Sequence, residues 1–114
     1  MATTGNLKLA FGVHRQPKPA PVQVLRQVET EAQALAISIA AGNHKLAYIA
    51  ACTGKSVSYI SRLQKGKRPI PERLVGMLCA ATGTTLLAQY RELQRALDGR
   101  GEVLRLAEIL REAA

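Results

Sequence analysis

The chain has 114 residues, of which 47% are hydrophobic, 21% charged and 4% aromatic. This length and apolar content favour one folded domain and argue against wholesale disorder, and no apolar run reaches the roughly 18 residues of a membrane span. The formal net charge is +8, from 16 Lys and Arg against 8 Asp and Glu, which predicts a polyanionic partner such as nucleic acid or an anionic membrane surface.

The positive charge is concentrated in the first two-thirds of the chain. Residues 32–71 contain six basic residues and no acidic one, whereas residues 72–114 contain six of each sign. We therefore expect the polyanion to bind the first two-thirds of the chain, where no carboxylate opposes it.

Residues 1–21 are predicted to form an extended basic arm. Three prolines within five residues disfavour regular structure, and the charge comes from Lys8, His14, Arg15 and Lys18. Two alternatives stay open, a tail with incidental charge and an arm that enters the DNA minor groove. The N-terminal residues lack the cationic and apolar regions of a secretory signal, so we expect a cytoplasmic protein associated with the nucleoid.

The remainder is predicted to be all-α with about six helices, because apolar residues recur at spacings of three and four and no stretch alternates like a strand. Glycines mark the expected ends of the first four helices, at Gly42, Gly54, Gly66 and Gly83. The first helix carries a long apolar stripe that starts at Leu25. The second, third and fourth helices are expected to begin at Asn43, Ser56 and Pro71, because such residues are frequent at helix starts.

A fifth helix is expected to begin at Thr84 or Thr85, and Gly99 and Gly101 are expected to separate it from a short last helix. The apolar residues of these two helices are Leu86, Leu87, Tyr90, Leu93, Leu97, Val103, Leu104, Leu106, Ile109 and Leu110. They predict a dimerisation surface, and the alternative is that they complete the core of the monomer.

Residues 49–69, with the sequence IAACTGKSVSYISRLQKGKRP, carry the pattern of two helices joined by a tight turn. Ala50 is small where the two helices approach each other, and Gly54 supplies a turn conformation that other residues resist. Ile60 and Leu63 follow at positions that face back into the core. This spacing is the pattern of a helix-turn-helix.

The segment resembles the Cro/phage-repressor (XRE-like) family over roughly residues 43–87. The resemblance implies a lambda-repressor-like helix-turn-helix bundle and a sequence-specific regulator of transcription that binds double-stranded DNA, most simply a repressor of bacterial or phage origin. It implies base contacts at Val57, Ser58 and Arg62, with Ser61 as a further candidate. It implies contacts to the DNA backbone at Tyr59, Lys65 and Lys67.

The third helix supports the same interpretation independently of the resemblance. Helical periodicity places Ser58, Ser61, Arg62 and Lys65 on one arc, and Val57, Ile60 and Leu63 on the opposite side. Small hydroxyl side chains allow close approach in the major groove, where arginine pairs with guanine. Further phosphate contacts are expected from Lys45, Lys55, Ser56 and Arg68. The alternative is a solvated basic face without a ligand.

Other types of site fit the sequence poorly. The run from Thr53 to Ser56 has the Gly-Lys-Ser of a nucleotide-binding loop, but Ile49 stands where that loop needs its first glycine. His44 and Cys52 lack a second pair of ligands for zinc. We therefore expect no enzyme activity, no cofactor and no metal, and we expect Cys52 and Cys79 to be buried thiols.

The expected organisation is an arm over residues 1–21, a DNA-binding domain over residues 22–98 and a C-terminal helix over residues 99–114 that serves dimerisation. A homodimer without membrane contact would bind half-sites one helical turn apart, about 34–36 Å. Two alternatives stay open. One is an antitoxin-like or phage accessory regulator whose main partner is another protein, and the other is a basic module that binds RNA or an anionic surface.

Overall fold

The computed structural model of the protein describes residues 16–113, so residues 1–15 of the predicted arm lie outside this range. Its helices are α2 (Val22–Leu25), α3 (Glu31–Ala41), α4 (Leu46–Thr53), α5 (Val57–Gln64), α6 (Glu72–Thr82) and α7 (Leu86–Ala113). Over residues 16–113 no strand forms, although Lys18 and Thr84 make an isolated bridge. The all-α prediction with about six helices is therefore confirmed for the described part of the chain.

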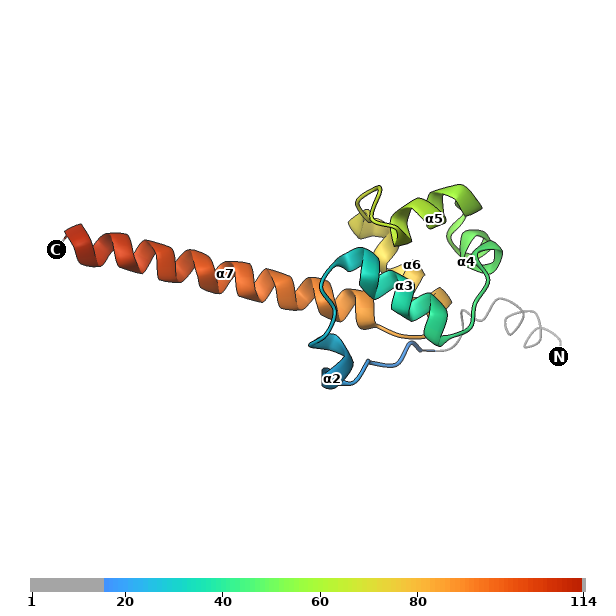
Figure 1. Cartoon of the computed structure of the whole chain (residues 1–114), viewed down its shortest axis with the longest axis horizontal. Coiled ribbons are helices and arrows are strands. Elements are labelled where there is room, and N and C mark those ends of the chain that lie inside the picture. The colour runs from blue at the N-terminus through green and yellow to red at the C-terminus, as the bar shows by residue number, and fades with distance from the viewer. Residues whose placement is uncertain (1–15, 114) are drawn as a thin grey trace.

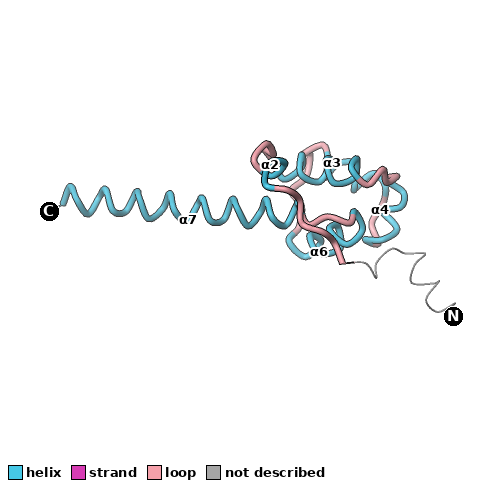
Figure 2. The backbone as a smooth tube through the Cα atoms, turned by 90° about the horizontal axis from the view of Figure 1, so that it is seen from below, coloured by secondary structure: helices cyan, strands magenta, loops and turns pink. Residues whose placement is uncertain are grey.

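Five helices and the start of the sixth form a small bundle, and the rest of α7 projects from it as a single helix (Figure 1). The view from below shows the same projection (Figure 2). Within the bundle α4 packs against α5 and α6, and α3 packs against α5, α6 and α7. The buried core consists of Val28, Ala34, Leu35, Ile39, Ile49, Ala50, Ile60, Leu63, Ile70, Leu74, Leu78, Cys79, Ala81, Leu86, Leu87 and Tyr90.

The predicted long first helix is in fact two helices, α2 and α3. Thr30 begins α3, because its hydroxyl accepts a hydrogen bond from the Gln33 N–H at 3.0 Å. The Gln33 side chain in turn accepts from the Glu29 N–H at 2.6 Å. These two hydrogen bonds satisfy backbone N–H groups at the start of α3. The helix is therefore interrupted before Thr30, although the apolar stripe of the sequence continues across the interruption.

The predicted start of the second helix at Asn43 is wrong. Asn43 has a left-handed φ of +54° and belongs to the turn after α3, whereas α4 begins at Leu46 with Lys45 at its N-cap. A ring nitrogen of His44 lies 3.1 Å from the carbonyl oxygen of Thr82, at the end of α6. The turn therefore joins α3 and α4 and is also tied to α6. Pro71 is the N-cap of α6, whereas the sequence predicted it as the first residue of the helix, so α6 begins one residue later than predicted.

The predicted break at Gly99 and Gly101 does not occur, because α7 is continuous from Leu86 to Ala113. Neither glycine has a positive φ, so neither adopts the left-handed conformation that ends a helix. The flanking leucines, arginines and glutamates favour helix strongly enough to carry it through both positions. The predicted fifth and sixth helices are thus one helix.

The segment before α2 is joined to the start of α7 by paired hydrogen bonds. The Lys18 N–H donates to Gly83 O and the Thr85 N–H donates to Lys18 O, both at 3.0 Å. The Gln89 side chain accepts from the Ala20 N–H at 2.8 Å and donates to Ala20 O at 3.2 Å. The last residues of the predicted arm are therefore part of the folded domain.

An ion pair connects α3, α7 and the loop between α5 and α6. Arg91 Nη1 lies 2.7 Å from Glu31 Oε1 and donates to Ile70 O at 3.2 Å. The other carboxylate oxygen of Glu31 accepts from the Ile70 N–H at 3.0 Å. Both side chains are mostly buried, with 20% of Arg91 and 33% of Glu31 exposed. One carboxylate and one guanidinium thus fix the end of the loop that follows α5.

We expect the substitution Arg91→Ala to lower the free energy of unfolding by about 1–3 kcal/mol, because it removes the charged partner of Glu31 Oε1 and the donor to the Ile70 carbonyl. Arg95 is the matched control, since its pair with Glu92 at 2.8 Å is 59% and 74% exposed. Arg95→Ala should change the stability by no more than about 0.5 kcal/mol. Urea unfolding of the two variants measures both values. Equal losses of stability would contradict the larger contribution that we expect from the buried ion pair.

Candidate nucleic-acid interface

The turn between α4 and α5 has the geometry that the sequence predicts. Gly54 lies in the left-handed region with a φ of +71°, a conformation that residues with a Cβ atom resist. Ser56 is the N-cap of α5, and its hydroxyl accepts from the Tyr59 N–H at 3.1 Å. These two residues fix where α4 ends and where α5 begins.

The helices on either side of the turn meet through small and apolar residues. Ala50 is 4% exposed, and Ile60 and Leu63 of α5 are fully buried. Thr53 is also buried, although it is polar, because its hydroxyl donates to Ile49 O at 2.9 Å within its own helix. Its methyl group is thereby free to pack, so a threonine fits beside the turn glycine without an unsatisfied polar atom.

The predicted base-contacting residues belong to the side of α5 that is not buried. Ser58 and Arg62 are exposed and Ser61 is half-buried. Val57 is 46% exposed, so its assignment by helical periodicity to the buried side is wrong. At the first turn of an eight-residue helix the angular rule is weak, because the core does not extend that far. These exposed side chains are compatible with the predicted base contacts.

The predicted phosphate-contacting residues surround this face. Lys45, Ser56, Lys65, Lys67 and Arg68 are exposed. Lys55 and Tyr59 are half-buried, and the Lys55 ammonium nitrogen lies 5.6 Å from the centre of the Tyr59 ring. This cation–π contact gives the lysine a defined position beside the start of α5.

The cations of this region differ from those of α7 in their partners. Four of the five arginines of α7 form ion pairs with glutamates, namely Arg91, Arg95, Arg105 and Arg111, whereas Arg100 forms none within residues 16–113. Within residues 16–113 no ion pair involves the six cations Lys45, Lys55, Arg62, Lys65, Lys67 and Arg68. The four paired arginines are neutralised internally, whereas the six cations around α5 present uncompensated positive charge to solvent.

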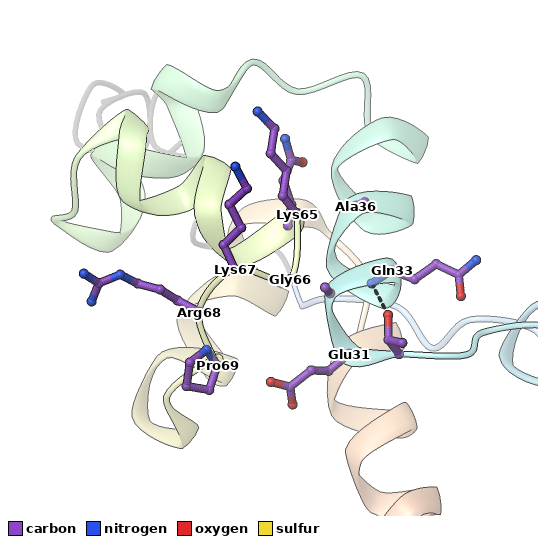
Figure 3. A pocket seen from close by; sticks show the side chains of 11 residues that line it. Glu31, Gln33, Ala36, Lys65, Gly66, Lys67, Arg68 and Pro69 are labelled. Carbon is purple, nitrogen blue, oxygen red and sulfur yellow. Dashed lines mark hydrogen bonds between the residues drawn. The ribbon is translucent and has the colours of Figure 1, made fainter.

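The loop after α5 borders an open groove of about 710 Å³ whose other wall is the start of α3. Lys65 and Lys67 extend from the loop on the side opposite Glu31 (Figure 3). The Glu31 carboxylate is already held by Arg91 and Ile70, so it does not neutralise the loop. Thr30, Gln33 and Gln64 also line the groove. Their position there could not be predicted from the sequence, because polar residues of this kind occur on any protein surface.

Residues 16–113 contain no candidate metal site, no membrane-spanning helix and no disulfide. Among residues 16–113 no group of three or more His, Cys, Asp or Glu could hold a metal ion. None of the helices in that range is both long enough and apolar enough to cross a membrane. Cys79 is buried as predicted, and burial raises the pKa of its thiol, whereas Cys52 is half-buried. Neither forms a disulfide.

Comparison with known protein families, with curated proteins and with solved structures finds no match to this chain. Function therefore has to be inferred from the residues of the site.

Proposed function

We propose that the protein is a sequence-specific double-stranded DNA-binding protein that regulates transcription, most simply as a repressor that occupies its operator. The observation that carries the proposal is the surface around α5. Its outward side combines small hydroxyls with an arginine, and the surrounding cations have no internal counterion among residues 16–113. A polyanion supplies the missing counterions, and duplex DNA also offers a groove wide enough for a helix.

The proposed mode of binding assigns different roles to the two sets of residues. α5 lies in the major groove, where Arg62 of its last turn pairs with a guanine and Ser58 and Ser61 contact neighbouring base edges. Val57 offers an apolar contact to a thymine methyl group. The lysines around the helix contact phosphates, which fixes register and adds affinity without sequence information.

Selection of duplexes from a randomised pool, followed by binding of the selected duplex in solution, tests this proposal. We expect a submicromolar dissociation constant for the selected duplex at physiological salt and a 10³-fold or larger preference over random duplex. RNA of the same sequence and anionic phospholipid vesicles, at matched salt, are the competitors. Stronger binding to either competitor would favour a basic module of another type.

Lys45 offers a variant in which stability and binding should change in opposite directions. It is the N-cap of α4, has no side-chain cap hydrogen bond and places a positive charge at the positive end of a helix dipole. We therefore expect Lys45→Ser to raise the stability by about 0.5–1 kcal/mol, through a new cap, while weakening DNA binding through the loss of a phosphate contact.

Lys45→Gln is the matched control, because it removes the charge without supplying a good cap. Chemical denaturation gives the stability of both variants and fluorescence anisotropy gives their affinity for DNA. Unchanged affinity in both variants would remove Lys45 from the interface.

A further inference from the structure

The outer part of α7 packs against no other helix of residues 16–113. Every residue from Arg95 to Ala113 is exposed. The large apolar side chains of this segment, with their exposed fractions, are Leu97 (50%), Val103 (65%), Leu104 (60%), Leu106 (53%), Ile109 (56%) and Leu110 (71%). A lone helix that contains two glycines and exposes leucines is marginal in water, so a partner would stabilise it.

Part of this apolar surface repeats with the period of a coiled coil. Small or apolar residues recur at alternating spacings of three and four, at Ala96, Gly99, Val103, Leu106, Leu110 and Ala113. We call this row the seam. Asp98, Arg105, Glu108, Arg111 and Glu112 all lie off the seam, and Glu102–Arg105 and Glu108–Arg111 form ion pairs along the helix. A heptad row of this kind fits one facing helix.

We propose that a second copy of this chain packs antiparallel against the seam and forms a two-fold symmetric dimer. The pairing deepens the proposed function, because two domains would double the DNA site, although it can be tested without DNA. The predicted dimer surface is accordingly narrower than the sequence suggests. Leu86, Leu87 and Tyr90 are excluded from it because they are buried in the monomer.

The sizes of the seam residues favour the antiparallel direction. With the two seams aligned end to end, Gly99 faces Leu110 of the partner subunit and Val103 faces Leu106 of the partner subunit, so a small residue meets a large one. In a parallel pair Gly99 would face Gly99 of the partner subunit and leave a gap, while the large leucines would meet each other. Uneven layers of that kind lose packing contacts.

Charge favours the same direction and a second copy as the occupant. Residues 95–113 contain four arginines and four acidic residues, so self-association of this segment brings no net repulsion. A parallel pair would bring Arg95 close to Arg100 of the partner subunit, and it would also place the two cationic DNA-binding domains side by side. The antiparallel pair keeps these domains at opposite ends.

This geometry changes the expected spacing of the half-sites. At 1.5 Å per residue, Tyr90 and Tyr90 of the partner subunit would lie about 44 Å apart along the helix axis. The bundle lies at the end of α7 that is farther from the dimer centre (Figure 1). One turn of DNA, about 34 Å, is too short for this separation, so we expect half-sites two turns apart.

Light scattering of the full chain and its variants tests the pairing. We expect a dimer at tens of micromolar, and Leu106→Glu should raise the dissociation constant about 100-fold or more, because each dimer loses two buried leucines. Leu97→Glu is the matched control, since Leu97 is similarly exposed but lies on the opposite side of the helix. A monomeric wild-type chain, or equal effects of the two variants, would overturn the proposal.

Disulfide cross-linking tests the direction. A mixture of Gly99→Cys and Leu110→Cys chains should give the mixed disulfide dimer, identified by its mass, while Gly99→Cys alone should not form a dimer of its own. The wild-type chain reports any background from Cys52 and Cys79. A Gly99→Cys homodimer would show a parallel pair and contradict the proposal. A cross-linked dimer that fails to bind DNA would contradict the proposed function and leave the pairing intact.

Discussion

Raising the salt concentration from 50 to 200 mM should weaken binding to duplex DNA by about 500-fold. The reason is the set of six cations between residues 32 and 71, which form no ion pair within residues 16–113. Each phosphate that they neutralise releases counterions and contributes about −0.9 to the slope of log affinity against log salt. Arg62 contacts a base in the proposed mode of binding, so the other five cations make the phosphate contacts and give a slope of about −4.5.

Titration by fluorescence anisotropy at four or five salt concentrations measures this slope. Lys67→Ala should reduce its magnitude by about 0.9, because one phosphate contact is lost. Arg105 is the matched control, since it is exposed, lies far out on α7 and is paired with Glu102 at 2.8 Å. Arg105→Ala should leave the slope unchanged. Affinity that stays flat between low and moderate salt would contradict the electrostatic part of the proposal.

Arg62→Ala should lower the affinity for the specific site by about 1–3 kcal/mol, a factor of roughly 5 to 150, and change the affinity for random DNA little. Arg62 is exposed in the last turn of α5, on the side that carries the serines, and a bidentate pair with guanine is worth about this much discrimination. The loss should be concentrated at one base pair of the site.

Lys67→Ala is the comparison for this prediction. A phosphate contact carries no sequence information, so this variant should weaken binding to specific and random duplexes about equally. Both side chains are exposed, and neither substitution should cost more than about 0.5 kcal/mol of stability. If the two variants lose affinity in the same proportion on both duplexes, the division between base contacts and phosphate contacts is wrong.

Features that depend on a single residue's local chemistry could be predicted from the sequence. Gly54 and Gly83 both have positive φ values, and the hydroxyl of Ser56 caps α5. A turn that requires a left-handed residue, or a helix start that requires an acceptor, leaves few alternatives at that position. The arrangement of α4, turn and α5 could therefore be placed to within about three residues.

Errors arose where two local signals competed. The apolar stripe from Leu25 suggested one long helix, but the pair formed by Thr30 and Gln33 starts a new one. Gly99 and Gly101 suggested a break, yet glycine weakens a helix without ending it unless the chain also turns. Hydrophobic periodicity predicts neither the interruption before Thr30 nor the continuity of α7, because it indicates which side of a helix is apolar and not where the helix ends.

The residues of the candidate site could be predicted from the sequence, but the contacts that hold the neighbouring helices in place could not. Exposure of Ser58 and Arg62 follows from helical periodicity, whereas the exposure of Val57 does not. The ion pair of Arg91 with Glu31 joins residues 60 positions apart, and no local pattern indicates it. Contacts of this kind depend on how the helices pack, so they require the three-dimensional structure.

Protection of guanine N7 atoms in a selected duplex tests most directly whether α5 reads the major groove. N7 lies on the major-groove edge of guanine, so an arginine paired there shields it from methylation by dimethyl sulfate. We expect the wild-type protein to protect at least one guanine per half-site, and Arg62→Ala to lose protection at that guanine while Lys67→Ala retains it at saturating protein. Failure to enrich any duplex, or N7 protection that does not depend on Arg62, would contradict the proposed role of α5.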